Sequence, residues 1–302
     1  MQPTLNGIIG TPLKREEWPS FPKRMLDFVL KGRSYVYEVA DQDRQLIVNR
    51  DGRGNSIPDI RDIQYMHFFS RSELRFSDAP PLRLPAPLNP CSSIGLSESL
   101  GNAIRNGGVL RKGTVICEGV IDTGDLVLVD KFSYHFRKPK RGEVFVFNTI
   151  DIEGTRKRVE KNRSHIADQE DATHYIKRLA AVPGDTLSVS PPHILIDGKI
   201  AREPGFEKVY QMPLHDGGGA KGYSFASPGS GNGPPVLVKP GDQMVLKKDD
   251  AAPGMREYAA LGDNSGNSLD SRYWGSVKEF NVVGPALFSL WPITSGHWGF
   301  IR

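Results

Sequence analysis

Two adjacent cations inside an apolar stretch are the first residues of this chain whose placement could support chemistry. Lys177 and Arg178 lie within Tyr175–Ala181, where most other residues are apolar. Side chains alternate between the two faces of a β-strand, so one of the two cations must point to whichever face is buried. A buried ammonium tends to lose its proton and can then act as a general base, whereas arginine stays charged. By itself, the segment fits an exposed edge strand with both cations in water at least as well.

A dense polar loop at Ala260–Trp274 carries a second set of reactive or positioning groups. Asp270 and Arg272 are two residues apart and could pair on one side of an extended backbone. Ser268 and Ser271 offer hydroxyls that could hold another side chain in place. A surface turn is the usual meaning of a composition this rich in Asn, Gly and Ser.

Two further segments indicate little about function when each is considered alone. Thr123–Lys131 and Lys140–Phe147 alternate turn, apolar strand, basic turn and apolar strand, which is the pattern of a common hairpin. The chain opens with Met-Gln-Pro-Thr-Leu.

Taken together and in this order, the segments resemble those of the type I signal peptidases, from about residue 123 to residue 302. The resemblance rests on GDLVLVDKF and PKRGEVFVF, then YIKRLAAVPGD, then LGDNSGNSLDSRYWG, and the last of these is highly specific. The nucleophile segment of that family reads Ser-Met-x-Pro-Thr-Leu. Its serine would be the residue immediately before Met1.

The resemblance implies a role for each matching residue. Lys177 would be the general base that takes the proton of the serine hydroxyl, with no His or Asp required. Ser268 would hydrogen-bond the lysine amine and orient it. Asp263, Asp270 and Arg272 would brace the loop that carries Ser268. The substrate groove and its small apolar pockets would be lined by Met1, Leu5, Tyr175 and Ile176.

The same resemblance implies a serine endopeptidase that removes signal peptides from exported preproteins after small residues, in Ala-x-Ala-like sequences. Its partners would be those signal peptides and the membrane surface, with no nucleic acid, no cofactor and no metal. The full-length form would be anchored in the cell membrane, with the catalytic domain on the non-cytoplasmic (periplasmic or extracellular) side. The alternative from another class is a non-catalytic pseudoprotease that binds extended peptides.

The chain as written lacks the nucleophilic serine, and no Ser-Met pair occurs anywhere in it. The oxyanion donors that the family places at and just upstream of that serine are missing as well, so we expect the chain to be inactive as a protease. Either the sequence omits an upstream membrane anchor together with the serine, or the protein is a pseudoenzyme. Ser265 departs from the family pattern, because many members have arginine after Gly-Asp-Asn.

Composition argues against several other classes of protein. The net charge is +4 with both signs interspersed, which gives no argument for nucleic-acid binding. The seven histidines show no HExxH or other close metal-binding spacing. No apolar stretch approaches the roughly 20 residues that span a bilayer. Cys91 and Cys117 leave both a disulfide and two free thiols open, and free thiols are the simpler expectation.

The 32 glycines and 23 prolines separate short runs of Val, Ile, Tyr and Phe, which indicates many short strands. We expect a mostly β fold: antiparallel coiled β-sheets of the signal peptidase type, with an appended insertion region. Residues 1–5 would be a remnant of the nucleophile segment and residues 6–114 an insertion of unknown role. Residues 115–302 would form the catalytic β-core, with an accessory region at about 199–250.

Strands are expected throughout the second half of the chain, at Thr114–Glu118, Leu126–Val129, Glu143–Phe147, Tyr175–Ala181, Thr186–Val189, Ile194–Ile196, Met244–Leu246, Tyr258–Leu261 and Val282–Leu290. In the insertion, Ser34–Val39 and Gln45–Val48 flank a polar turn, which is the pattern of a hairpin.

Two helices are expected in the insertion, one from Phe21 to about Leu30 and one at about Ser97–Asn106. Ser20 can cap the first helix and Gly32 can end it. Its apolar side chains recur at helical spacing, which predicts packing against a core, at Phe21, Met25, Phe28 and Val29.

Overall fold

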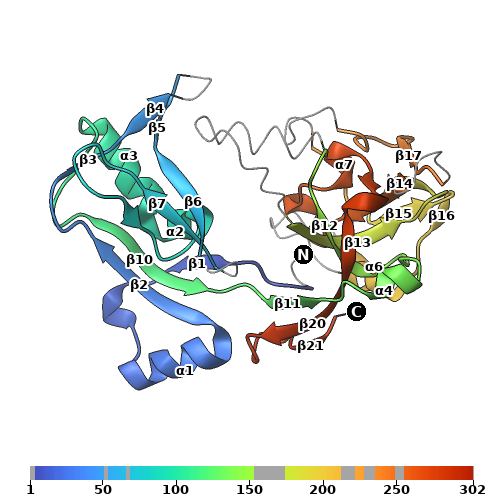
Figure 1. Cartoon of the computed structure of the whole chain (residues 1–302), viewed down its shortest axis with the longest axis horizontal. Coiled ribbons are helices and arrows are strands. Elements are labelled where there is room, and N and C mark those ends of the chain that lie inside the picture. The colour runs from blue at the N-terminus through green and yellow to red at the C-terminus, as the bar shows by residue number, and fades with distance from the viewer. Residues whose placement is uncertain are drawn as a thin grey trace. The chain divides into compact units, whose positions relative to one another are not determined.

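The structure is a computed structural model that describes residues 4–50, 54–65, 69–152, 174–211, 222–227, 235–248 and 255–301. Met1, expected in the substrate groove, lies outside these residues. Within them the chain forms mostly antiparallel β-sheets with a few helices (Figure 1). The expected fold class is confirmed.

The chain divides into two compact units. Unit 1 comprises the N-terminal residues through Asn6, then Leu126–Leu290, and the C-terminal residues from His297. Unit 2 comprises Gly7–Asp125 and Trp291–Gly296. The chain therefore leaves unit 1 after Asn6 and returns to it at Leu126. The assignment of residues 6–114 as an insertion into a family core stays a prediction.

Unit 1 is built on a seven-stranded sheet. Its order is β11 (Leu126–Val129), β20 (Val282–Trp291), β12 (Val144–Asn148), β13 (His174–Ala181), β18 (Glu257–Leu261) and β19 (Val277–Lys278), with β21 (Gly299–Phe300) paired to β20. Strand β13 runs antiparallel to both of its neighbours, β12 and β18. The strand that carries the two adjacent cations is therefore an interior strand and not an edge.

A second sheet of unit 1 has the order β16 (Lys199–Ile200), β15 (His193–Ile196), β14 (Thr186–Ser190) and β17 (Gln243–Val245). The helices of this unit are α4 (Ser133–Phe136), α6 (Pro204–Tyr210) and α7 (Ser271–Trp274), with 3-10 turns η3 (Ser265–Asn267) and η4 (Glu279–Asn281). One core cluster joins Phe206 and Val209 of α6 to Ala180 of β13 and Leu261 of β18. The described part of the accessory region thus packs into the same core as the strands of the candidate site.

Unit 2 contains a three-stranded antiparallel sheet of β1 (Ile9–Pro12), β10 (Val115–Asp122) and β2 (Arg33–Val39). Smaller sheets are formed by β3 (Arg44–Gln45) with β9 (Val109–Leu110), by β4 (Val48–Arg50) with β5 (Ser56–Pro58), and by β6 (Ile60–Tyr65), β7 (Phe69–Leu74) and β8 (Leu82–Arg83). The helical segments are η1 (Arg15–Glu17), α1 (Phe21–Lys31), α2 (Leu88–Cys91), a distorted turn η2 (Ser92–Leu96) and α3 (Ser97–Arg105). Cys91 and Cys117 are both buried in the core of this unit, and no disulfide joins them.

The expected strands of the second half are confirmed, with ends that differ by at most four residues, and both expected helices are confirmed with ends that differ by at most one. The expected hairpin at residues 34–48 is wrong. Strand β2 pairs with β10, and β3 pairs with β9, so each strand finds a partner far along the chain. A hairpin pattern reports two strands and a turn, but it does not exclude a longer-range partner.

The expectation that α1 packs its apolar residues against a core is also wrong. Phe21, Met25 and Val29 are 65%, 50% and 53% exposed, and the one buried residue of the helix is Asp27. The Asp27 carboxylate accepts a hydrogen bond from the Tyr35 hydroxyl (2.9 Å) and pairs with Lys31 (2.9 Å). A polar anchor thus fixes this helix to unit 2, and its apolar face is turned outward.

Candidate active site

Strand β13 and the end of β18 place the sequence-predicted residues next to one another. In the register of β13 with β18, Arg178 lies opposite Leu261, the last residue of β18. The chain then continues through Gly262, next to Lys177, and Asp263, which is bonded to Arg178, and enters the polar loop. Strand pairing therefore brings together two segments that are separated by more than 80 residues in the sequence.

The amine of Lys177 donates a hydrogen bond to the hydroxyl of Ser268, with a distance of 2.9 Å between Nζ and Oγ. The contact depends on the absence of a side chain at Gly262. A Cβ placed there would lie 2.0 Å from Ser268 Oγ and 3.4 Å from Lys177 Nζ. Glycine at this position therefore makes room for the contact.

Lys177 is half-buried. Desolvation is the main cause that lowers the pKa of Lys177 below its ordinary value. The carboxylate of Asp270 opposes this effect and the guanidinium of Arg272 adds to it. The Lys177 amine can thus lose its proton more readily than a lysine in water.

Arg272 holds the loop that carries Ser268. It is fully buried and pairs with both carboxylate oxygens of Asp270, at 2.8 and 2.7 Å. It also donates to the Ser265 hydroxyl (2.6 Å), to the backbone carbonyl of Ser265 (2.8 Å) and to that of Ser224 (2.8 Å). At position 265 many family members have arginine. Here the Ser265 hydroxyl accepts hydrogen bonds from the Arg272 guanidinium and from the backbone N–H of Ser224.

Asp270 in turn ties this loop to strand β18, because its carboxylate accepts the backbone N–H of Gly262 (3.0 Å). Burial would raise the pKa of Asp270, but the guanidinium of Arg272 outweighs it and holds the pKa below the ordinary value. The Ser271 hydroxyl accepts a further hydrogen bond from the backbone N–H of Ala260 (2.9 Å). The loop is therefore a fixed, internally bonded structure rather than a solvated surface turn.

Arg178 supports the site from the other face of β13. It is fully buried and makes two bonds to the carboxylate of Asp263, at 2.8 and 2.7 Å. Its guanidinium also donates to the Thr4 hydroxyl (3.1 Å) and to the carbonyl of Gly142 (2.6 Å), and Thr4 itself bonds to Asp263. Thr4 belongs to the segment that resembles the family's nucleophile segment, and these bonds anchor Thr4 in unit 1.

Leu5 and the residues of the expected groove also lie in this unit. Leu5 is buried in a small cluster with Val144 and Ala286, against which Ile176 packs. The ring centre of Tyr175 is 5.9 Å from Lys177 Nζ. All the sequence-predicted site residues that the structure describes therefore gather around β13 and the end of β18.

The sequence analysis did not assign a positioning role to four residues of this network: Thr4, Arg178, Gly262 and Ser265. Arg178 carried a usable signal, since an arginine inside an apolar strand needs a buried carboxylate partner. The identity of that partner, Asp263, depends on a strand pairing that no local pattern reveals.

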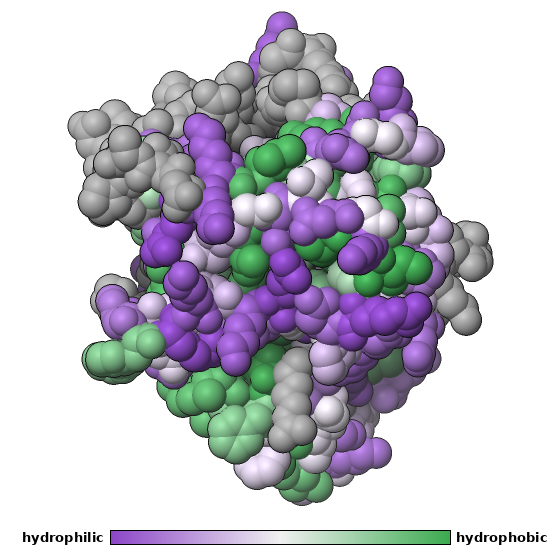
Figure 2. Space-filling model, turned by 90° about the vertical axis from the view of Figure 1, so that its right-hand side faces the viewer, coloured by the Kyte–Doolittle hydropathy of each residue, from purple (hydrophilic) through white to green (hydrophobic). Residues whose placement is uncertain are grey.

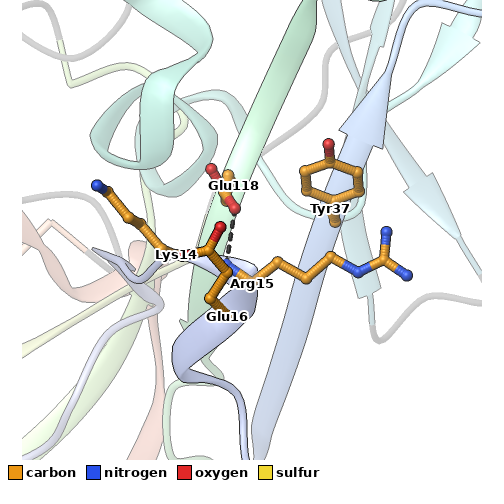
Figure 3. A pocket seen from close by; sticks show the side chains of 5 residues that line it. All are labelled: Lys14, Arg15, Glu16, Tyr37 and Glu118. Atoms are coloured by element: carbon orange, nitrogen blue, oxygen red, sulfur yellow. Dashed lines mark hydrogen bonds between the residues drawn. The ribbon is translucent and has the colours of Figure 1, made fainter.

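No cluster of His, Cys, Asp and Glu suited to a metal ion occurs among the residues that the structure describes. In the same residues, no helix is both long and apolar enough to cross a bilayer. A separate surface pocket in unit 2 is lined by Lys14, Arg15, Glu16, Tyr37 and Glu118 (Figure 3). None of its lining residues belongs to the candidate active site.

Comparison with known proteins points to one family. Residues 118–291 match the model of the family described as signal peptidase, peptidase S26. The protein named probable signal peptidase I-2 from Synechocystis sp. is 30% identical over 176 residues, which cover 58% of this chain and 59% of that protein. Signal peptidase I from Leptolyngbya laminosa is 29% identical over 175 residues, covering 57% of this chain and 63% of that protein.

The chain thus spans about three fifths of the length of these two relatives. A crystal structure of a signal peptidase I from Enterococcus faecalis V583 matches with a TM-score of 0.27 at 20% identity, over 49% of this chain and 97% of that one. The family match covers more than half of the chain, including both β13 and the loop that carries Ser268. The chain belongs to the peptidase S26 family of signal peptidases.

Proposed function

We propose that the protein is a serine endopeptidase that removes signal peptides from exported preproteins by a Ser/Lys dyad, with Lys177 as the general base. The observation that carries this proposal is the 2.9 Å contact between Lys177 Nζ and Ser268 Oγ, at a lysine whose pKa is lowered by desolvation. A neutral amine held in this way can accept the proton of an attacking serine hydroxyl as that hydroxyl adds to a peptide carbonyl. Ser268 directs the amine, and Asp263, Asp270 and Arg272 keep the surrounding loop in place.

The nucleophile in this proposal is a serine at the position that the family segment gives it, immediately before Met1. Anchoring of Thr4 by Arg178 and Asp263, and burial of Leu5 beside Ile176, support this placement. The 302 residues start with Met1 and contain no Ser-Met pair. This chain by itself should therefore show no peptidase activity.

The substrate would be an extended signal peptide with small residues before the cleaved bond, bound by hydrogen bonds to a strand edge. Met1, Leu5, Tyr175 and Ile176 would line its apolar pockets. The catalytic unit would lie against the non-cytoplasmic surface of the cell membrane. Apolar side chains exposed on unit 1 support this location, including Phe132, Phe136 and Trp298. Figure 2 shows hydrophobic residues clustered next to a band of hydrophilic ones on the face that it displays.

The test uses two proteins, the 302-residue chain and the same chain extended at its N-terminus so that a serine precedes Met1. Each is incubated with a peptide that contains Ala-x-Ala, and mass spectrometry locates any cut. We expect the serine-bearing chain to cut after the second alanine and the 302-residue chain not to cut. A matched peptide with leucine in place of both alanines should remain intact.

Equal cleavage of the two peptides would contradict the assigned specificity. Binding of the Ala-x-Ala peptide by the serine-bearing chain without any cleavage would contradict the peptidase proposal and favour a peptide-binding module.

A further inference from the structure

Helix α1 of unit 2 is amphipathic in the reverse of the usual sense. Helices of globular proteins turn their apolar face to the core and their polar face to water. In α1 the buried residue is Asp27, which is 5% exposed, whereas the large apolar side chains are on the surface. Their exposed fractions lie between 47% and 65%, at Phe21, Met25, Leu26, Phe28 and Val29.

These side chains form one continuous face. At 100° per residue, they fill an arc of the helix in the order Phe28, Phe21, Met25, Val29 and Leu26, and Asp27 lies opposite the middle of that arc. The helix therefore presents an unbroken apolar face to its surroundings, far wider than the scattered single apolar residues of an ordinary surface.

The C-terminal segment of unit 2 extends this face. The indole N–H of Trp291 donates to the carbonyl of Val29 (2.8 Å), and its ring packs edge-on against Phe28 with 6.1 Å between ring centres. Thr294 donates its hydroxyl (3.0 Å) and its backbone N–H (3.2 Å) to the carbonyl of Leu30. Ile293, between these anchors, is 52% exposed. We name these six exposed residues the α1 patch: Phe21, Met25, Leu26, Phe28, Val29 and Ile293.

The charges that border the α1 patch are mainly basic. The residues from Lys14 to Lys31 include five basic and three acidic side chains, and the inward-facing Asp27 is paired with Lys31, which leaves four basic and two acidic side chains. Lys23 is exposed, and the Arg24 guanidinium lies over the rings of Trp18 (5.5 Å) and Phe21 (5.7 Å). In the preceding turn η1, the backbone N–H of Arg15 donates a hydrogen bond to the carboxylate of Glu118 on β10 (2.7 Å; Figure 3).

We propose that the α1 patch is a docking face for an anionic lipid bilayer, on which α1 lies parallel to the surface. An apolar face with Phe, Leu and Trp, flanked by Lys and Arg, is the pattern of helices that bury their apolar side at the headgroup boundary. The basic border complements anionic headgroups, whereas two copies of the patch facing each other would bring like charges together. This contact goes beyond the proposed peptidase activity and does not depend on it, because α1 lies outside the residues 118–291 that match the family.

The test is flotation of the full 302-residue chain with vesicles of phosphatidylcholine and phosphatidylglycerol at about 3:1. The patch variant carries Met25→Asp and Val29→Asp. The matched control carries Val48→Asp and Ile57→Asp, which alter two exposed apolar residues on β4 and β5 of the same unit by the same change of charge. Circular dichroism checks that both variants remain folded.

We expect the unmodified chain and the control to float with these vesicles, and the bound fraction of the patch variant to fall at least about tenfold. Binding of the unmodified chain should also weaken on vesicles of phosphatidylcholine alone. Equal flotation of both variants, or no flotation of the unmodified chain, would overturn the proposal. So would self-association in sedimentation velocity that the patch variant loses, since a second copy would then be the occupant.

Discussion

At the scale of single residues, β13 carries two adjacent cationic side chains in the interior of a sheet, and Lys177 and Arg178 are accommodated there in two different ways. Arginine cannot give up its proton under ordinary conditions, so Arg178 is enclosed together with the carboxylate of Asp263. Lysine can give up its proton, and Lys177 is hydrogen-bonded to the Ser268 hydroxyl and has a lowered pKa. Strand alternation predicted the opposite orientation of the two side chains. It could not predict which carboxylate would join Arg178.

The lowered pKa of Lys177 makes a prediction about stability. Between the folded pKa and the unfolded value of about 10.4, the unfolded chain binds more protons than the native one, so the free energy of unfolding rises with pH. Lys177→Met removes this dependence. We expect the variant to gain stability relative to the unmodified chain near pH 7, and to lose that advantage as the pH approaches 10.

Urea denaturation of the 302-residue chain at several pH values measures this difference. Lys199→Met is the matched control, because Lys199 is an exposed lysine on β16. A difference that is the same for both variants at every pH would mean that Lys177 is not desolvated in the folded protein.

At the scale of elements, local patterns predicted which segments form strands and helices, and failed where the outcome depended on partners. Helix α1 and its end at Gly32, which has a φ of 64°, follow from sequence signals. The direction of its apolar face does not, because periodicity shows that a helix has two faces but not which one meets the protein. The prediction of a hairpin at residues 34–48 was wrong for the same reason, since β2 pairs with β10 and not with the nearby strand.

The junction between β18 and the polar loop makes a prediction at this scale. In the serine-bearing chain, Gly262→Ala should lower the rate of peptide cleavage by about 10–1000-fold, because the added Cβ would displace Ser268 from Lys177. The matched control is Gly101→Ala in α3, where a Cβ meets nothing within 4 Å. That control should keep its rate and gain about 0.5–1 kcal/mol of stability. Unimpaired cleavage by Gly262→Ala would mean that the contact between Lys177 and Ser268 is not needed.

At the scale of the whole molecule, the chain divides into two compact units, and unit 2 comprises Gly7–Asp125 and Trp291–Gly296. Composition and turn signals were enough to predict a mostly β fold, and the family segments predicted the residues that meet at the site except for Thr4, Arg178, Gly262 and Ser265. The sequence alone placed the start of the catalytic core at about residue 115, and this boundary stays a prediction: the family match begins at residue 118, whereas the compact units divide after Asp125. Strand β10 explains the difference: it reads as one more strand of the core, yet it pairs with β1 and β2 of unit 2.

The central claim is that Lys177 is the general base of a Ser/Lys peptidase, and cleavage of an Ala-x-Ala peptide by the serine-bearing chain tests it most directly. Three proteins are compared: the serine-bearing chain itself, its Lys177→Met variant and its Lys199→Met variant. The account predicts that Lys199→Met cleaves at the unmodified rate, and that Lys177→Met loses at least about a thousandfold in kcat/KM. Cleavage by Lys177→Met at the rate of the Lys199→Met control would contradict the account.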